Sequence, residues 1–129
     1  MPQFLTLDEV LESHAEQVAT YGGSDGIRDV GLLESAISQP QAMFGGQYLH
    51  ADIFEMAAAY LFHLVKNHPF IDGNKRVGLE ASLLFLETNG YSVETTDEEL
   101  VELVLRTAQS QVGKADIAEF FQRNSVAIE

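Results

Sequence analysis

The chain has 129 residues, no cysteine and a formal net charge of −13, which excludes disulfides and thiolate zinc sites and argues against direct binding to nucleic acid. Charged and polar residues interrupt every apolar run, and the N-terminus has no signal-peptide pattern, so neither a membrane span nor secretion is expected. We expect one soluble, cytoplasmic domain over residues 1–129.

The first part of the chain predicts two helices and a loop. Thr6 and Glu9 form a capping-box pattern at the start of the first helix, which a cluster of glycines ends. Asp29 is suited to cap a second helix, which must stop before Pro40. Residues 40–50 contain two glycines and no helical period, which indicates an exposed loop or a short hairpin.

The remainder predicts four more helices. Apolar residues lie on nearly every side of the segment 51–67, which indicates a buried central helix. The next helix covers about 74–89 and ends at an Asn-Gly pair. An extended link at 91–93 precedes a helix that begins after two threonines, and a last helix covers about 115–123. These elements predict an all-α fold, a compact bundle of about six helices.

The connection at 68–76, HPFIDGNKR, is the most informative segment of the chain. Three of the seven Lys and Arg residues lie between positions 66 and 76, although the chain is acidic. Lys75 and Arg76 fall in the first turn of a helix, where the helix dipole disfavours cations. A bound anion would offset that cost, and phosphate is the natural candidate because a helix N-terminus offers free N–H groups.

Each other residue of this segment has both a chemical and a structural interpretation. His68 can act as a general base near neutral pH, and Asp72 can cap the helix or bind the Mg²⁺ that accompanies nucleotide phosphates. Gly73 permits a left-handed turn, Asn74 can donate to a phosphate oxygen, and Phe70 is suited to anchor the loop in the core. Singly such residues are most often structural, but together they favour a phosphate-binding catalytic site.

The segment resembles the Fic-family signature His-x-Phe-x-Asp/Glu-Gly-Asn-x-Arg, and its Asn-Lys-Arg is most similar to the Doc (death-on-curing) branch. YGG at Tyr21, GLLESAI, the apolar helix from Ala51 and LLFLETNGY also resemble Doc toxins in order and spacing, over about residues 5–124. The resemblance implies an all-α fold that transfers a group from ATP to a protein hydroxyl. Most Fic enzymes transfer AMP, whereas Doc transfers the terminal phosphate, with the translation factor elongation factor Tu as target.

The resemblance also implies roles for the residues of the loop. His68 would take the proton from the attacking Ser or Thr hydroxyl, and Asp72 would orient the reactants or bind Mg²⁺. Four residues would hold the phosphates of ATP, two as an anion cradle and two as neutralising cations: Gly73, Asn74, Lys75 and Arg76.

Two departures from the Fic pattern favour phosphate transfer over AMP transfer. Most Fic enzymes carry a second arginine three residues after the first, where this chain has Leu79, and a glycine where it has Lys75. We therefore expect a Doc-type toxin that transfers the ATP γ-phosphate to a Ser or Thr hydroxyl of a translation protein. AMP transfer is the first alternative, and a non-catalytic, antitoxin-binding helical module is the second.

The chain lacks the Ser/Thr-x-x-x-Glu-Gly/Asn motif with which many Fic proteins block their own ATP site, so the resemblance implies inhibition by a separate antitoxin chain. Residues 44–50 correspond to a flap that docks the target as an added strand in Fic proteins; a plain surface loop is an equal alternative. Lys66 could supply a further cation, but we favour a solvated charge at the end of a helix. His63 is interpreted as a helix histidine with a local hydrogen bond, and His14 and His50 have no partner constellation nearby.

Overall fold

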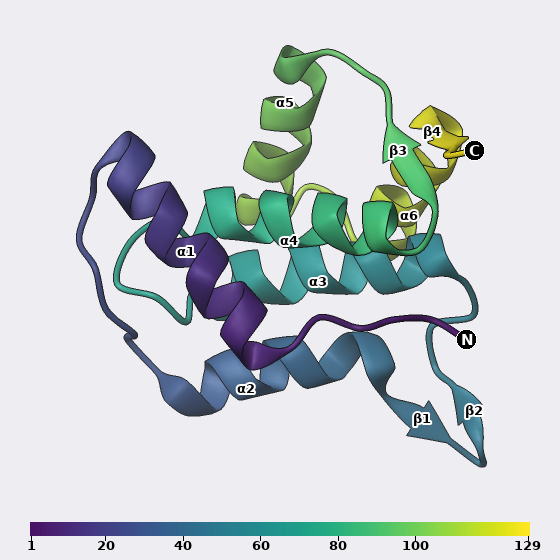
Figure 1. Cartoon of the computed structure of the whole chain (residues 1–129), viewed down its shortest axis with the longest axis horizontal. Helices are drawn as coiled ribbons and strands as arrows, with labels where there is room; N and C mark the ends of the chain where they lie inside the picture. Colours follow the sequence, from purple (N-terminus) through teal and green to yellow (C-terminus); the bar gives the residue numbers. More distant parts are fainter.

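A computed structural model describes every residue, 1–129, and contains six helices and two small antiparallel sheets (Figure 1). The helices are α1 (Leu7–Tyr21), α2 (Val30–Ser38), α3 (Ile53–Asn67), α4 (Asn74–Thr88), α5 (Asp97–Ala108) and α6 (Lys114–Asn124). A 3-10 turn, η1 (Gln39–Gln41), follows α2, and the strands are β1 (Met43–Phe44), β2 (Gln47–Tyr48), β3 (Tyr91–Val93) and β4 (Ser125–Ala127). The predicted helical fold is confirmed. No helix is both long enough and apolar enough to span a membrane.

The helices begin where the sequence supplies capping side chains. At the start of α1 the N–H of Thr6 donates to Glu9 Oε1 at 2.9 Å, and the N–H of Glu9 donates to Thr6 Oγ1 at 3.1 Å. Asp29 caps α2, as predicted, Thr96 caps α5, and Asp52 caps α3. Each cap satisfies an N–H group that the helix itself leaves without a partner.

Helix α3 lies at the centre of the molecule, with α4 beside it (Figure 1). Every residue from Met56 to Leu61 is buried, as predicted for a helix that is apolar on nearly all sides. The two helices come close at Gly78, where an added methyl group would lie 2.9 Å from Val65 Cγ2. All six helices contribute side chains to one continuous cluster of 22 buried apolar residues.

Residues 43–48 form a hairpin, so the hairpin interpretation of the loop at 40–50 is confirmed. Gly45 and Gly46, at its turn, both have positive φ, 59° and 78°, which glycine adopts without strain. The side chain of Phe44 is 80% exposed. The hairpin therefore stands out from the helices as a separate edge (Figure 1).

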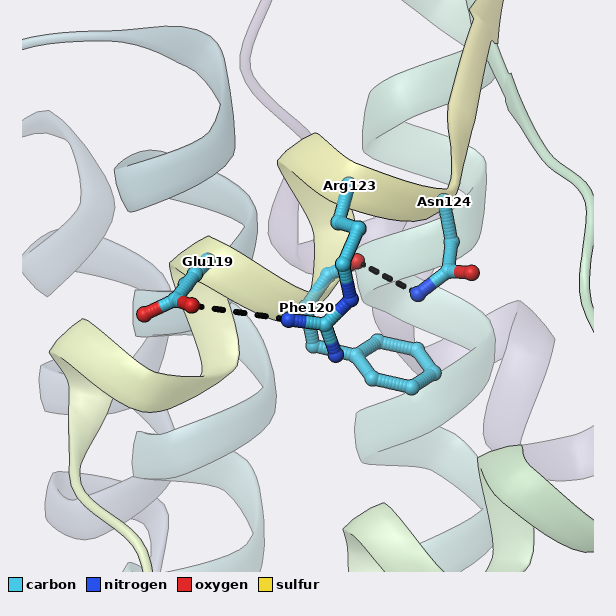
Figure 2. A network of polar contacts seen from close by, with 4 residues as sticks. All are labelled: Glu119, Phe120, Arg123 and Asn124. Atoms are coloured by element: carbon cyan, nitrogen blue, oxygen red, sulfur yellow. Dashed lines mark hydrogen bonds and ion pairs between the residues drawn. The ribbon is translucent and has the colours of Figure 1, made fainter.

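The end of α6 leads into a strand that the sequence analysis did not predict. The side-chain amide of Asn124 donates to the carbonyl of Phe120 at 2.9 Å, and Arg123 forms a 3.5 Å ion pair with Glu119 beside the Phe120 ring (Figure 2). The ion pair is exposed and stabilises little. The following residues, β4, pair with β3. Three residues are too few to reveal a strand whose partner lies over 30 positions earlier.

Replacing Tyr60 by phenylalanine is expected to destabilise the fold. The N–H of Leu5 donates to the Tyr60 hydroxyl at 2.9 Å, and both residues are buried. Phenylalanine fills the same space but leaves that N–H without a partner, which costs about 1–3 kcal/mol. Urea unfolding measures the loss. Tyr21→Phe, at an exposed tyrosine, is the control, and equal stability of the two variants would contradict the prediction.

Candidate active site

The loop between α3 and α4 has a residue in the left-handed conformation at each end. His68 ends α3 with φ 51° and ψ 53°, and Gly73 precedes α4 with φ 81°. Glycine adopts this conformation freely, whereas a histidine does so at a cost of about 1–2 kcal/mol. Between them Phe70 is fully buried, which confirms the prediction that it anchors the loop in the core.

All six residues that the sequence analysis assigned to the site line one hollow of about 400 Å³. They share it with two residues of α3 and one of α5, and its lining consists of Val65, Lys66, His68, Asp72, Gly73, Asn74, Lys75, Arg76 and Ala108. The side chains of His68, Asp72, Lys75 and Arg76 are exposed, so both a nucleotide and a protein hydroxyl can reach them. The hollow thus combines an imidazole, a carboxylate and three cations.

One wall of the hollow is the N-terminus of α4, which has no capping side chain and no acidic residue in its first turn. The first main-chain hydrogen bond of this turn runs from Val77 N to Gly73 O at 3.0 Å. The N–H groups of Asn74, Lys75 and Arg76 precede it and have no acceptor within the chain. Free N–H groups and two cations make this wall electropositive and suited to an anion.

The carboxylate of Asp72 is fixed by main-chain donors. The N–H of Ser24 donates to Oδ2 at 3.3 Å, and the N–H of Gly73 donates to Oδ1 at 2.8 Å. These two hydrogen bonds, with a smaller effect of nearby Arg76, lower the pKa of Asp72 below its ordinary value, so the group is ionised at neutral pH. Asp72 does not cap α4, because Gly73 occupies that position.

The donor set around Asp72 fits Mg²⁺ bound together with a nucleotide. No group of three His, Cys, Asp or Glu residues is placed to hold a metal ion, so the protein has no complete metal cage. Mg²⁺ commonly binds through one or two carboxylates while phosphates and waters supply its other ligands. An ionised carboxylate beside an anion-binding helix N-terminus meets that requirement.

The side chain of Asn74 closes the loop upon itself. Its Oδ1 accepts the N–H of Phe70 at 2.9 Å, and its Nδ2 donates to the Phe70 carbonyl at 3.0 Å. The side-chain donor that the sequence analysis assigned to a phosphate oxygen is therefore already in use. What Asn74 offers an anion is its main-chain N–H, while its buried amide fixes the shape of the loop.

The expectation that His14 has no partner constellation is wrong, because His14 has two partners in the loop. Its Nε2 lies 2.7 Å from the carbonyl oxygen of Asp72, and its ring stacks on Phe70 with centroids 3.8 Å apart. A carbonyl only accepts, so Nε2 carries the proton. Asp72 is 58 positions away, and no local pattern reveals such a contact. The available signal was a polar residue one turn after Val10 on the buried side of α1.

The segment before α2 also supports the loop, and the sequence analysis gave it no role. The N–H of Arg28 donates to the Pro69 carbonyl at 2.7 Å, and the N–H of Ile71 donates to the Gly26 carbonyl at 3.1 Å. The Arg28 guanidinium donates to two further carbonyls, of Asn67 and His68. The connection between α1 and α2 thus runs beside the loop (Figure 1).

Two other interpretations change with the structure. Lys66 is exposed, but its Nζ contacts Ser110 Oγ and it lines the hollow, so it is more than a solvated charge. The local hydrogen bond expected for His63 is wrong, because its Nε2 lies 3.1 Å from Nζ of Lys114, 51 positions away. Burial, with a further effect of Lys114, lowers the pKa of His63 to about 4, and His63 does not line the hollow.

Replacing Asn74 by alanine is expected to loosen the loop. The change leaves the buried N–H and carbonyl of Phe70 unpaired, which costs about 2–6 kcal/mol at about 1–3 kcal/mol per group. Asn74→Asp keeps the acceptor and loses the donor, so its loss should be intermediate. Urea unfolding and amide exchange at Phe70 measure both effects. The control is Lys75→Ala in the same turn, and equal stability of Asn74→Ala and the control would refute the assignment.

The chain is similar to a known protein family and to two curated relatives. The model of the Fic/DOC family matches residues 4–86, which contain α1 to α3, the loop and most of α4. "Protein kinase doc" from Escherichia phage P1 is 33% identical over 116 residues, 90% of this chain and 90% of that protein. "Toxin Doc" from Mycolicibacterium smegmatis (strain ATCC 700084 / mc(2)155) is 31% identical over 126 residues, 93% of this chain and 95% of that protein. The chain therefore belongs to the Fic/DOC family.

Proposed function

We propose that the protein is a Doc-type toxin that transfers the γ-phosphate of ATP to a Ser or Thr hydroxyl of a translation protein similar to elongation factor Tu. The observation that carries the proposal is the hollow that joins exposed His68 to an uncapped, cationic helix N-terminus. The names of the two relatives, a protein kinase and a toxin, support the same function.

In the proposed reaction His68 acts as the general base. Its imidazole takes the proton of the Ser or Thr hydroxyl as that oxygen bonds to the γ-phosphorus. The bond from this phosphorus to the β,γ-bridging oxygen breaks, and ADP leaves with the electron pair. Histidine is the side chain that most often serves as general base in enzymes.

The other residues of the hollow bind and orient the phosphates. Lys75, Arg76 and the free N–H groups at the start of α4 balance phosphate charge, which is the main catalytic contribution in phosphoryl transfer. Asp72, ionised and fixed by Ser24 and Gly73, is the proposed Mg²⁺ ligand. When bound, Mg²⁺ neutralises charge on the phosphates.

The environment of Leu79 favours transfer of the γ-phosphate over transfer of AMP. Leu79 lines an apolar hollow of about 210 Å³ next to Lys75 and Arg76, together with three residues of α5. A second arginine at this position would supply the further phosphate clamp of AMP-transferring relatives. AMP transfer stays the second candidate, because the base and the anion wall would serve it as well.

The proposal includes three features outside the hollow. The β1–β2 hairpin, with its exposed Phe44, is the proposed docking edge for the protein substrate, to which it would add as a strand. A separate antitoxin chain is the proposed inhibitor, since the sequence has no Fic inhibitory motif. The proposed site of action is the cytoplasm, where translation proteins work.

The His68→Ala variant is expected to lose phosphate transfer. The purified protein is mixed with Mg²⁺, bacterial extract and ATP labelled on either the γ- or the α-phosphate. A protein band should carry γ-label only, and the variant should reduce it about 10²–10⁴-fold, the usual contribution of a general base. An α-labelled band would support AMP transfer instead. Absence of both labels would favour the non-catalytic, antitoxin-binding module.

Restoring the Fic pattern at two positions is expected to change the transferred group. In Lys75→Gly with Leu79→Arg, γ-transfer should fall about 100-fold, as on removal of one charge-stabilising group, and α-label should appear on the target. Each single substitution serves as a control. A double variant that keeps full γ-transfer without α-label would show that these positions do not select the transferred group.

A further inference from the structure

Helix α3 ends in an unusual way at the proposed catalytic base. His68 is left-handed, with φ 51°, at a position where helices normally use Gly or Asn. The strain is about 1–2 kcal/mol for a residue with a side chain. Surrounding contacts must therefore hold this conformation, and with it the direction in which the imidazole leaves the main chain.

The usual hydrogen bonds of a left-handed helix ending are incomplete here. In a Schellman ending, the N–H of the residue after the left-handed one closes the turn onto the helix. That residue is Pro69, which has no N–H. The carbonyls at the end of α3 are therefore left to other donors, in the chain or in the solvent.

Arg28 supplies these donors. Its Nε donates to the His68 carbonyl at 2.6 Å, and its Nη2 donates to the Asn67 carbonyl at 2.9 Å. Its main-chain N–H donates to the Pro69 carbonyl at 2.7 Å, so one residue binds three successive carbonyls. The guanidinium charge also complements the negative end of α3. Lysine offers no such rigid pair of donors.

We propose that Arg28 is a positioning residue that holds His68 left-handed and so keeps its imidazole directed at the reacting hydroxyl. The inference rests on the proposed role of His68 as the base. Without Arg28 the strain at His68 is released, and because Pro69 disfavours the right-handed helical region, His68 becomes extended. Its side chain then leaves the hollow.

Arg28 contacts none of the groups proposed to bind phosphate. The hydrogen bonds of its side chain end at the carbonyls of Asn67 and His68, whereas the phosphate wall is the start of α4. Loss of Arg28 should therefore lower kcat and leave the KM for ATP unchanged. If Arg28 had a purely structural role, its loss would lower stability without a selective decrease in kcat.

The kinetic test compares Arg28→Ala and Arg28→Lys with the control Tyr60→Phe. This control loses a hydrogen bond to a side chain of α3 but does not touch the loop. In the γ-label assay Arg28→Ala should lose about 100-fold in kcat, as for a reacting group displaced by about 1 Å, with an unchanged KM for ATP. Arg28→Lys should retain only part of the wild-type kcat. Added methylguanidinium should raise the kcat of Arg28→Ala. Tyr60→Phe should keep the wild-type kcat.

A second measurement does not depend on activity. NMR couplings that report φ of His68 in isotopically labelled protein should give a positive angle in the wild type and a negative one in Arg28→Ala. A positive angle in the variant, or a kcat loss no greater than that of Tyr60→Phe, overturns the proposal. If the wild type transfers no label, the proposed function fails, and the NMR result alone decides whether Arg28 holds His68.

Discussion

The burial of Phe70 is the constraint on which the candidate active site depends. Loops usually run over the surface and move, but this one is anchored in the core by a fully buried ring, on which His14 stacks. The amide of Asn74 binds the main chain of the same residue on both sides. With Phe70 fixed, His68 and Asp72, two positions before and after it, are held at the rim of one hollow.

The overall charge of the protein and the charge at its candidate site have opposite signs. A net charge of −13 repels long polyanions such as nucleic acid, whereas a small anion responds to the field at its own site. At the start of α4 that field comes from two cations and three unpaired N–H groups. The acidic surface and the electropositive hollow are thus compatible, and together they favour a compact phosphate ligand over a polymer.

Local sequence patterns predicted what local physics determines. The capping residues, the buried α3, the Asn-Gly end of α4 and the gathering of six residues from 68–76 all follow from residues close together in the chain. The roles of His14 and Arg28 could not be predicted, because their partners lie 58 and 40 positions away. Asn74 was predicted only in part. Its place at the site follows from the sequence, but only the fold shows that its side chain binds the main chain of the loop.

The residues proposed for catalysis are synthesised before the helices that complete the core. Every residue proposed to take part in catalysis lies before position 77, and α5 contributes only Ala108 to the wall of the hollow. Yet α3, which carries His68 at its end, packs in one cluster with Ile117 and Phe121 of α6. A chain still emerging from the ribosome therefore contains the complete set of reacting groups before it contains the core that holds them in place. Under the proposed function, a growth-arresting activity would begin only when α6 has been made and packed.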